Sequence, residues 1–418
     1  MKRAMLLTVG TGPGVEHAVF FSIKQHNPDY VVLCASSTTN PLLDLIKGLL
    51  GEGWGEDFLL IDEFAEINDF EKLFHHYTAT IGMVIRKGYE ASELVADYTS
   101  GTKAMSAALT AAAIDCNIGS LSYVYSDRRD KDYGRSQTGG MKVSSLSPHL
   151  IYSRQRLQLA RQFFNQYRFE AVISLLIEPH HPEVSEEALW LTQLAQAYDA
   201  WDKLNYEVAR DQFAQLLKHN VTKQKRLTDL LEVHKKTTGN LASQCQLYNE
   251  VAKRTSEGLP SDEQVRRVLG HSLVKDLLDN ASRRYQEGKY DDGSARLYRA
   301  LELLGQIEFI KATGLANAGA PVEALPSLLQ EKFTAQFRNG KIELPLMKTY
   351  MALEVLGCEL GTKFMKQQKE WLKMLSKRNY SLLAHGLQPV GKNDYIHFRQ
   401  EVSNLLPGGE DTLWPTLG

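Results

Sequence analysis

Residues 93–106 read ELVADYTSGTKAMS, an apolar run that passes through a glycine-containing turn into a segment suited to a helix. Four similar apolar runs alternate with helix-length segments over the first 126 residues, at residues 4–10, 30–36, 57–63 and 120–126. This alternation predicts a parallel sheet covered by helices. We therefore expect a Rossmann-like α/β domain over residues 1–150.

The segments between the apolar runs have the length and polarity of surface helices. They predict helices at Val15–Asn27, Pro41–Leu50, Asp69–Lys87 and Thr102–Asp115. A polar loop follows the last run, and residues 142–147 (KVSSLS) then suit the returning arm of a hairpin. The predicted sheet thus ends in a strand that reverses direction.

From His149 onward the strand pattern disappears and long amphipathic segments replace it. They predict helices within Ser153–Asn165, Glu186–Leu217, Leu241–Ser256, Leu346–Leu387 and Tyr395–Leu406. Gly, Pro and Ser interrupt the helical pattern near residue 265, in SEGLPSDEQ. We expect an α/β domain at residues 1–150, a helical connecting domain at 151–265 and a helical domain at 266–418, so the fold class is α/β followed by all-α.

The composition restricts the partners of the chain. A formal net charge of −2 excludes the large basic excess that coats nucleic acid without specificity, so any RNA contact must be local. The four cysteines form no CxxC pair, which argues against a disulfide framework or a zinc site and fits a cytoplasmic location. Asp115 and Asn117 interrupt the apolar stretch Met105–Val124, which falls short of a membrane span. We expect no membrane partner.

Loops rich in glycine, hydroxyl and amide groups follow three of the apolar runs: TVGTGPG at 8–14, SSTTNP at 36–41 and TSGTK at 99–103. The carboxyl ends of parallel strands meet at one sheet edge, where helix N-termini offer free N–H groups to anions. We therefore expect a phosphate-bearing ligand there, with Lys103 as the point charge. The predicted ligand-binding residues are Gly10, Thr11, Gly12, Thr39, Asn40, Thr99, Ser100, Gly101, Thr102 and Lys103.

The glycines of the first loop do not follow the GxGxxG spacing, which disfavours a dinucleotide cofactor, and we expect no cofactor. The block DYTSGTKAMSAAL, at residues 97–109, together with VGTGPG after the first run, resembles the CARF domain of CRISPR-associated effector proteins from type III systems. The resemblance covers about residues 1–150. It implies that the ligand is a cyclic oligoadenylate, bound as an activator across a homodimer.

A candidate for catalysis lies near the end of the chain, in SKRNYSLLAHGL at residues 376–387, where Arg378 precedes His385 by seven residues. On a helix this spacing is two turns, which places both side chains on one face about 10 Å apart, and Gly386 suits a helix C-cap. Cleavage of RNA without a metal needs a proton-transferring group and a fixed cation. Arg266 precedes His271 by five residues, so both pairs fit an arginine followed by four to six residues and a histidine, and spacing alone does not separate them.

The neighbouring residues separate them. Arg378-Asn379 followed by Ala384-His385 resembles the catalytic motif of HEPN ribonucleases, the usual partners of CARF sensors. The resemblance implies that Arg378, Asn379 and His385 are catalytic, in a composite site at a homodimer interface, and that attack by the 2′-hydroxyl leaves a 2′,3′-cyclic phosphate. The expected function is a cyclic-oligoadenylate-activated, metal-independent endoribonuclease of CRISPR antiviral defence that cuts single-stranded RNA.

Two other functions stay open. Helical-hairpin patterns at residues 160–176 and 281–304 suit an interaction module, so the chain could be a non-catalytic regulator that binds the same ligand. The sensor domain could also degrade its own ligand, with Thr11 or Thr99 positioning the 2′-hydroxyls of the ring. The adjacent histidines at 75–76 and 180–181 point in different directions on a helix, and we expect no metal site.

Overall fold

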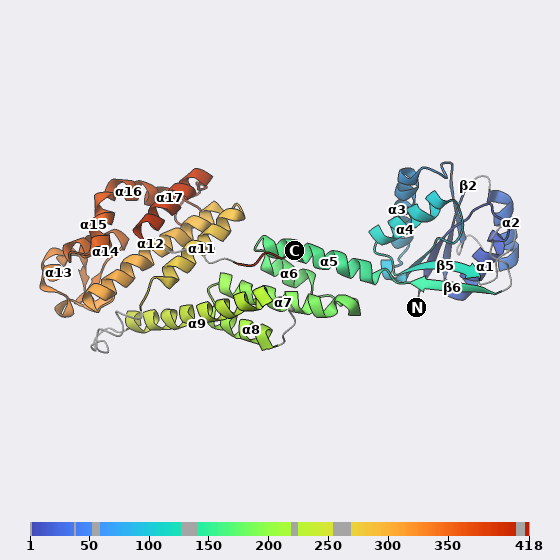
Figure 1. Cartoon of the computed structure of the whole chain (residues 1–418). Coiled ribbons are helices and arrows are strands. Elements are labelled where there is room, and N and C mark those ends of the chain that lie inside the picture. Colours follow the sequence, from blue (N-terminus) through green and yellow to red (C-terminus); the bar gives the residue numbers. More distant parts are fainter. Residues whose placement is uncertain are drawn as a thin grey trace. The chain divides into compact units, whose positions relative to one another are not determined.

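The computed structural model describes residues 2–36, 39–51, 59–126, 140–218, 225–253, 269–406 and 414–417. It divides into two compact units, Met1–Leu157 with Pro179–Ser185 and Gln158–Glu178 with Glu186–Gly418. The first unit contains a six-stranded sheet, and the second is mainly helical (Figure 1).

The sheet of the first unit has the strand order β3-β2-β1-β4-β5-β6. Its strands are β1 (Ala4–Thr8), β2 (Tyr30–Ser36), β3 (Leu59–Phe64), β4 (Leu94–Asp97), β5 (Ser120–Ser126) and β6 (Met141–Leu146). The first five are parallel, and β6 pairs antiparallel with β5. The predicted parallel sheet with a terminal hairpin is therefore confirmed, although residues 57 and 58 of the predicted third run lie outside the described residues.

Four helices cover the two faces of this sheet. They are α1 (Val15–His26), α2 (Asn40–Leu50), α3 (Phe70–Arg86) and α4 (Lys103–Asp115), within one residue of the predicted ends. Alternate residues of β1 point to opposite faces. Leu6 belongs to a core with α3 and α4, and Leu7 belongs to a core with α1 and α2. The chain crosses from one face to the other between β1 and β4, so the carboxyl ends of these two strands form the topological switch point where open α/β sheets bind ligands.

The second unit contains most of the helices. Two of them, α5 (His149–Asn165) and α7 (Pro182–Asp202), each have residues in both units. The others are α6 (Phe169–Leu175), α8 (Tyr206–Lys218), α9 (Lys225–Lys253), α11 (Ser272–Gln286), α12 (Tyr290–Thr313), α13 (Ser327–Lys332), α14 (Leu346–Val355), α15 (Glu359–Lys366), α16 (Gln368–Asn379) and α17 (Lys392–Leu405). The predicted helix Glu186–Leu217 is divided at Leu204, whose φ of 61° is incompatible with a continuous helix. The predicted run Leu346–Leu387 forms three helices, with Gly357 at a φ of 75° after the first.

The expectation that no strands follow His149 is wrong. A three-stranded sheet of β7 (Ala318–Pro321), β9 (Lys341–Glu343) and β8 (Phe337–Arg338) lies in the second unit. Between β8 and β9, Asn339 and Gly340 have φ values of 49° and 73°, which two-residue hairpin turns require. The strands are too short for an alternating pattern, but the Asn-Gly pair was a local signal for the hairpin.

A buried polar joint connects α7 to α11 in the second unit. The Asp202 carboxylate, at the end of α7, accepts hydrogen bonds from Arg283 Nε at 2.8 Å and Arg284 Nη2 at 2.5 Å. Asp276 accepts from Trp201 Nε1 and from the Tyr206 hydroxyl, each at 2.8 Å, and burial raises the pKa of its carboxyl to about 6. Such paired groups fix the contact between the two helices because a lost partner would leave a charge buried and unpaired.

None of the helices in the described residues is both long enough and apolar enough to span a membrane.

Candidate functional sites

The loops that follow β1 and β4 are locked together at the switch point of the sheet. The Thr8 hydroxyl donates to the Ser100 carbonyl oxygen, and the Ser100 hydroxyl donates to the Thr8 carbonyl oxygen. A Cβ on Gly10 would lie 2.5 Å from the backbone nitrogen of Gly101, so residue 10 must be glycine for the loops to touch. Gly101 has a φ of 95°, which glycine adopts without strain. The structure thus brings two of the three predicted ligand loops into direct contact.

The buried carboxylate of Asp97 stabilises this edge of the sheet through three hydrogen bonds. Its carboxylate is 2% exposed and accepts from Ser22 Oγ at 2.5 Å, from Ser122 Oγ at 2.9 Å and from the Thr99 backbone N–H at 2.9 Å. The network continues to His26, whose Nε2 lies 2.9 Å from Ser122 Oγ. Burial lowers the pKa of the His26 imidazole, and the nearby Asp97 charge opposes this shift. We assigned Asp97 no role from the sequence, although an acidic residue at the end of a buried strand is a signal for a buried polar network.

The hydroxyls of the third loop hold its shape. Thr99 Oγ1 accepts from the Val124 N–H at 2.7 Å, which leaves its own hydrogen to donate. Thr102 is the N-cap of α4, where its Oγ1 accepts from the Met105 N–H at 3.2 Å and donates to the Ile67 carbonyl oxygen at 2.6 Å. The Thr102 hydroxyl therefore both donates and accepts a hydrogen bond within the fold.

The groups left at the surface of this edge suit an anion. Lys103 is the first residue of α4 and is exposed, as are Gly101 and, in the first loop, Thr11 and Gly12. A helix N-terminus carries free N–H groups and a partial positive charge, to which the Lys103 ammonium adds a full charge. These groups can bind a phosphate at the end of β4.

The second loop contributes differently. Thr39 is 1% exposed, and its Oγ1 accepts from the Ser36 N–H at 3.1 Å and donates to the Ser36 carbonyl oxygen at 2.6 Å. Its side chain therefore shapes the turn before α2. Asn40 is the first residue of α2, and its side chain lies outside the described residues.

The candidate catalytic residues lie at the end of α16 and in the turn after it. The expectation that Arg378 and His385 share one helix is wrong, because α16 ends at Asn379 with Tyr380 as its C-cap. The chain then turns back, so that the His385 N–H donates to the Asn379 carbonyl oxygen at 3.1 Å. Gly386 is not a helix C-cap; it is needed because a Cβ there would collide with the Tyr380 carbonyl oxygen. A tight turn replaces two helical turns in bringing residue 385 back to residue 379.

The side chains of Arg378 and Asn379 interact directly. Arg378 Nη1 donates to Asn379 Oδ1 at 3.1 Å, and the guanidinium carbon lies 4.0 Å from the centroid of the Tyr298 ring. Arg378 Nε is buried and has no hydrogen-bond partner among the described residues. The His385 side chain is exposed, and no hydrogen bond joins it to Arg378 or Asn379 in the described part of the chain. The structure brings the backbones of all three residues together and orients the arginine.

Exposed apolar side chains surround the same turn. Five of them in α16 and the turn are half or more exposed, namely Leu372 at 50%, Tyr380 at 60%, Leu382 at 67%, Leu383 at 50% and Leu387 at 85%. Apolar residues in one segment mark an interaction surface far more often than scattered ones do.

The structure describes one residue of the competing pair, His271. Arg266 lies outside the described residues. His271 precedes α11, and its Nε2 is 2.8 Å from Glu308 Oε1 of α12. His76 likewise contacts Asp62 through its Nε2 at 2.8 Å. No group of three or more metal-ligating side chains is found among the described residues.

Two domain models match the helical part of the chain. A model of the Csm6 HEPN domain matches residues 263–408, and a model of the Csm6 6H domain matches residues 152–241, together more than half of the chain. The chain is a CRISPR-associated CARF–HEPN protein with two Csm6-type domain matches. The resemblance to CRISPR-associated CARF–HEPN proteins is thereby confirmed, and Arg378, Asn379 and His385 lie within the Csm6 HEPN match.

A solved Csm6 structure has a similar fold over most of the chain. The structure of Enterococcus italicus Csm6 bound to cyclic hexa-2'-fluoro-hexa-dAMP covers 97% of this chain, and 94% of its own chain is covered, with a TM-score of 0.50 and 13% identity. At this identity the likeness concerns the fold. No curated protein matches the sequence. The Csm6 domain matches begin at 152 and 263, and the predicted boundaries at 150 and 265 stay predictions.

Proposed function

We propose that this CARF–HEPN chain is a cyclic-oligoadenylate-activated endoribonuclease that cuts single-stranded RNA without a metal in CRISPR antiviral defence. The observation that carries the proposal is the turn after α16. It returns the His385 backbone to Asn379 beside the Arg378 guanidinium, within the segment that matches a Csm6 HEPN domain.

The chemistry follows from these three side chains. The 2′-oxygen of the RNA forms a bond to phosphorus, the bond from phosphorus to the 5′-oxygen breaks, and the product carries a 2′,3′-cyclic phosphate. A proton must leave the 2′-hydroxyl and another must reach the 5′-oxygen, and the exposed His385 imidazole has ring nitrogens that can accept or donate a proton. Arg378 supplies the fixed positive charge for the phosphate oxygens, and Asn379 holds the guanidinium.

We propose that the active form is a homodimer. One chain presents a single Arg378-Asn379-His385 set beside exposed leucines of α16 and the turn, which a second copy would cover. The two sets would then form one composite site.

We propose that the activator binds at the ends of β1 and β4. The structure of E. italicus Csm6, which shares this fold, holds a cyclic adenylate analogue. In this chain the glycine loops, the α4 N-terminus and Lys103 offer N–H groups and charge for phosphates at that edge. No cofactor enters the proposed reaction, and the cytoplasm is its proposed location.

The test is His385→Ala in the full chain. The substitution is expected to lower cleavage of a labelled single-stranded RNA at least a hundredfold, because positioned acid–base groups contribute about 10² to 10⁴ in rate. Binding of cyclic oligoadenylate, measured by calorimetry, is expected to be unchanged. Retained cleavage would remove His385 from the mechanism.

A further inference from the structure

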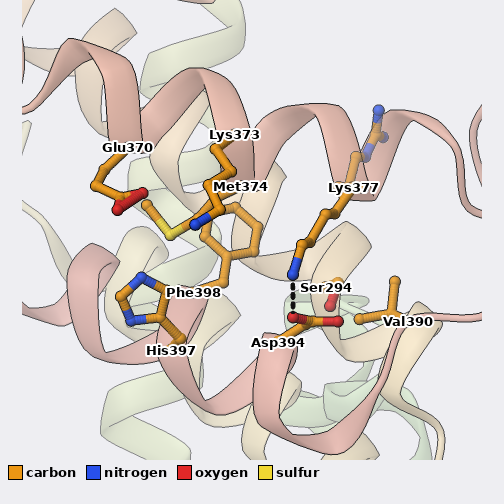
Figure 2. A pocket seen from close by; sticks show the side chains of 10 residues that line it. Ser294, Glu370, Lys373, Met374, Lys377, Val390, Asp394, His397 and Phe398 are labelled. Atoms are coloured by element: carbon orange, nitrogen blue, oxygen red, sulfur yellow. Dashed lines mark hydrogen bonds and ion pairs between the residues drawn. The ribbon is translucent and has the colours of Figure 1, made fainter.

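A small cavity lies beside the candidate catalytic arginine, between α12, α16 and α17. Its volume is about 70 Å³, and it is lined by Ser294, Glu370, Lys373, Met374, Lys377, Arg378, Val390, Asp394, His397 and Phe398 (Figure 2). Pockets for nucleotides and drug-sized ligands measure roughly 300–1,000 Å³. The cavity therefore suits a small group and excludes a nucleoside.

The charged groups that line the cavity favour an anion. Lys373 and Lys377 of α16 and His397 of α17 line it (Figure 2), as does Arg378 of α16. Two carboxylates, Glu370 of α16 and Asp394 of α17, line it as well, so three cationic side chains stand against two anionic ones. Lys377 Nζ is neutralised by Asp394 Oδ1 at 2.5 Å, whereas Lys373 forms no ion pair among the described residues. Positions 369, 373 and 377 recur every four residues, so Lys369 extends the same stripe of α16 by one turn.

Two buried donors at the cavity lack acceptors. Ser294 is 1% exposed, and its Oγ has no hydrogen-bond partner in the described part of the chain. Arg378 Nε is also buried without a partner. A buried donor without an acceptor costs about 1–3 kcal/mol, more for a charged group. Both donors can therefore give a hydrogen bond to an oxygen atom that enters the cavity.

We propose that this cavity is a phosphate subsite that holds the RNA phosphodiester next to the one that is cut. The proposal rests on the proposed function and adds a binding site to it. Lys373 and His397 contact the phosphate oxygens from two helices, Ser294 Oγ donates from the floor, and Arg378 connects the subsite to Asn379 through Nη1. Occupation of the subsite fixes the register of the RNA strand over Arg378.

The test uses the full chain with His385→Ala, so that RNA is bound and not cut. Fluorescence anisotropy of a labelled single-stranded RNA of mixed sequence is measured at several salt concentrations, with and without Lys373→Gln. Loss of one phosphate contact is expected to weaken binding about five- to tenfold and to reduce the slope of log K against log salt by about 0.7. Lys363→Gln is the control, because Lys363 is exposed on α15 and paired with Glu359 at 2.7 Å, and it is expected to change neither quantity.

Single methylphosphonate linkages in the RNA locate the contact. At one linkage the neutral phosphate is expected to weaken binding to the protein with Lys373, and this penalty is expected to vanish with Lys373→Gln. An equal penalty in both proteins at every linkage would overturn the proposal. The proposal would also be overturned if Lys373→Gln changed the binding of inorganic phosphate and left the RNA affinity unchanged, because the cavity would then bind free phosphate and not the RNA.

Ser294→Ala separates binding from folding. Removal of a buried donor without a partner is expected to leave the thermal stability unchanged or higher, while RNA binding weakens about tenfold as one hydrogen bond to a charged phosphate is lost. Unchanged RNA affinity would remove Ser294 from the subsite. If the wild-type chain binds and cuts RNA while Lys373→Gln binds it equally well, the subsite fails alone; if the wild-type chain neither binds nor cuts RNA, the proposed function fails with it.

Discussion

The sheet edge of the first unit and the turn after α16 in the second unit both carry candidate functional residues, but different forces hold them. At the edge, Thr8 and Ser100 exchange hydrogen bonds and the buried Asp97 joins α1, β4 and β5. The turn at residues 380–386 is held mainly by backbone hydrogen bonds, and its leucines face solvent.

The difference is between loops that side-chain hydrogen bonds fix within one chain and a turn whose apolar side chains face solvent. At the edge the loops are in contact and their buried hydroxyls are paired, so the exposed groups form a preformed surface for a ligand. The turn presents one arginine, one histidine and exposed apolar side chains, which suit a surface completed by a second copy. Substitutions at the two places should therefore damage different properties of the protein.

The largest expected effect lies at the turn. The double substitution Leu383→Glu and Leu387→Glu places charges on the exposed apolar surface, and we expect RNA cleavage to fall at least a hundredfold as the two copies separate there. Leu189→Glu on α7, where the leucine is 60% exposed, is the matched control and should leave cleavage unchanged. Full activity of the double variant would show that the leucines contact no second copy.

Asp97→Ala should damage the edge instead. It removes the acceptor of Ser22 Oγ, Ser122 Oγ and the Thr99 N–H, and we expect a loss of about 3 kcal/mol in the opening free energy of β4 and β5. Hydrogen exchange of the β4 and β5 amides measures this quantity. Asp115→Ala, at the exposed end of α4, should change it by less than about 0.5 kcal/mol. Equal protection in Asp97→Ala and the wild type would contradict the role of the network.

Lys103→Gln should reduce ligand affinity without loosening the fold. One charge-assisted hydrogen bond to a phosphate is worth about 1.5 kcal/mol, so calorimetry should show about tenfold weaker binding of cyclic oligoadenylate. The Tm should not change, because Lys103 is exposed. Lys47→Gln, in the last turn of α2, should bind the ligand as the wild type does, and a matching loss there would indicate a general charge effect.

The smallest expected effect concerns pH. The hydrogen bond from His76 to Asp62 raises the pKa of the imidazole above its usual 6.5. The pair therefore stabilises the fold fully below pH 6.5 and loses this contribution as the pH rises through the raised pKa. Thermal unfolding between pH 5.5 and 8.5 should show up to about 1 kcal/mol of pH-dependent stability that His76→Gln removes. Identical pH profiles would show that the pair contributes nothing.

Local patterns in the sequence predicted what local physics determines. Alternation of apolar runs located β1, β4 and the helices α1 to α4. This was possible because the apolar run of a buried strand and the periodicity of a helix both show within a short stretch of sequence. The network of Asp97 could not be predicted in this way, since Ser22 lies 75 positions away and only the folded sheet brings them together.

The turn after Asn379 illustrates a second limit. A seven-residue spacing fits a helix as well as a turn that returns on itself, and the close approach of Gly386 to the Tyr380 carbonyl favours the turn. The residues of the candidate active site were thus named from the sequence, while their geometry required the structure.

We propose that ligand at the sheet edge activates RNA cleavage by the residues at the end of α16. The most direct measurement incubates the full chain with a labelled single-stranded RNA, EDTA, and cyclic tetra-adenylate or cyclic hexa-adenylate. We expect cleavage that depends on one of the rings and leaves 2′,3′-cyclic phosphate ends. Binding of a ring by calorimetry, without cleavage of the RNA by any ring, would contradict it and identify a regulator that does not cut RNA.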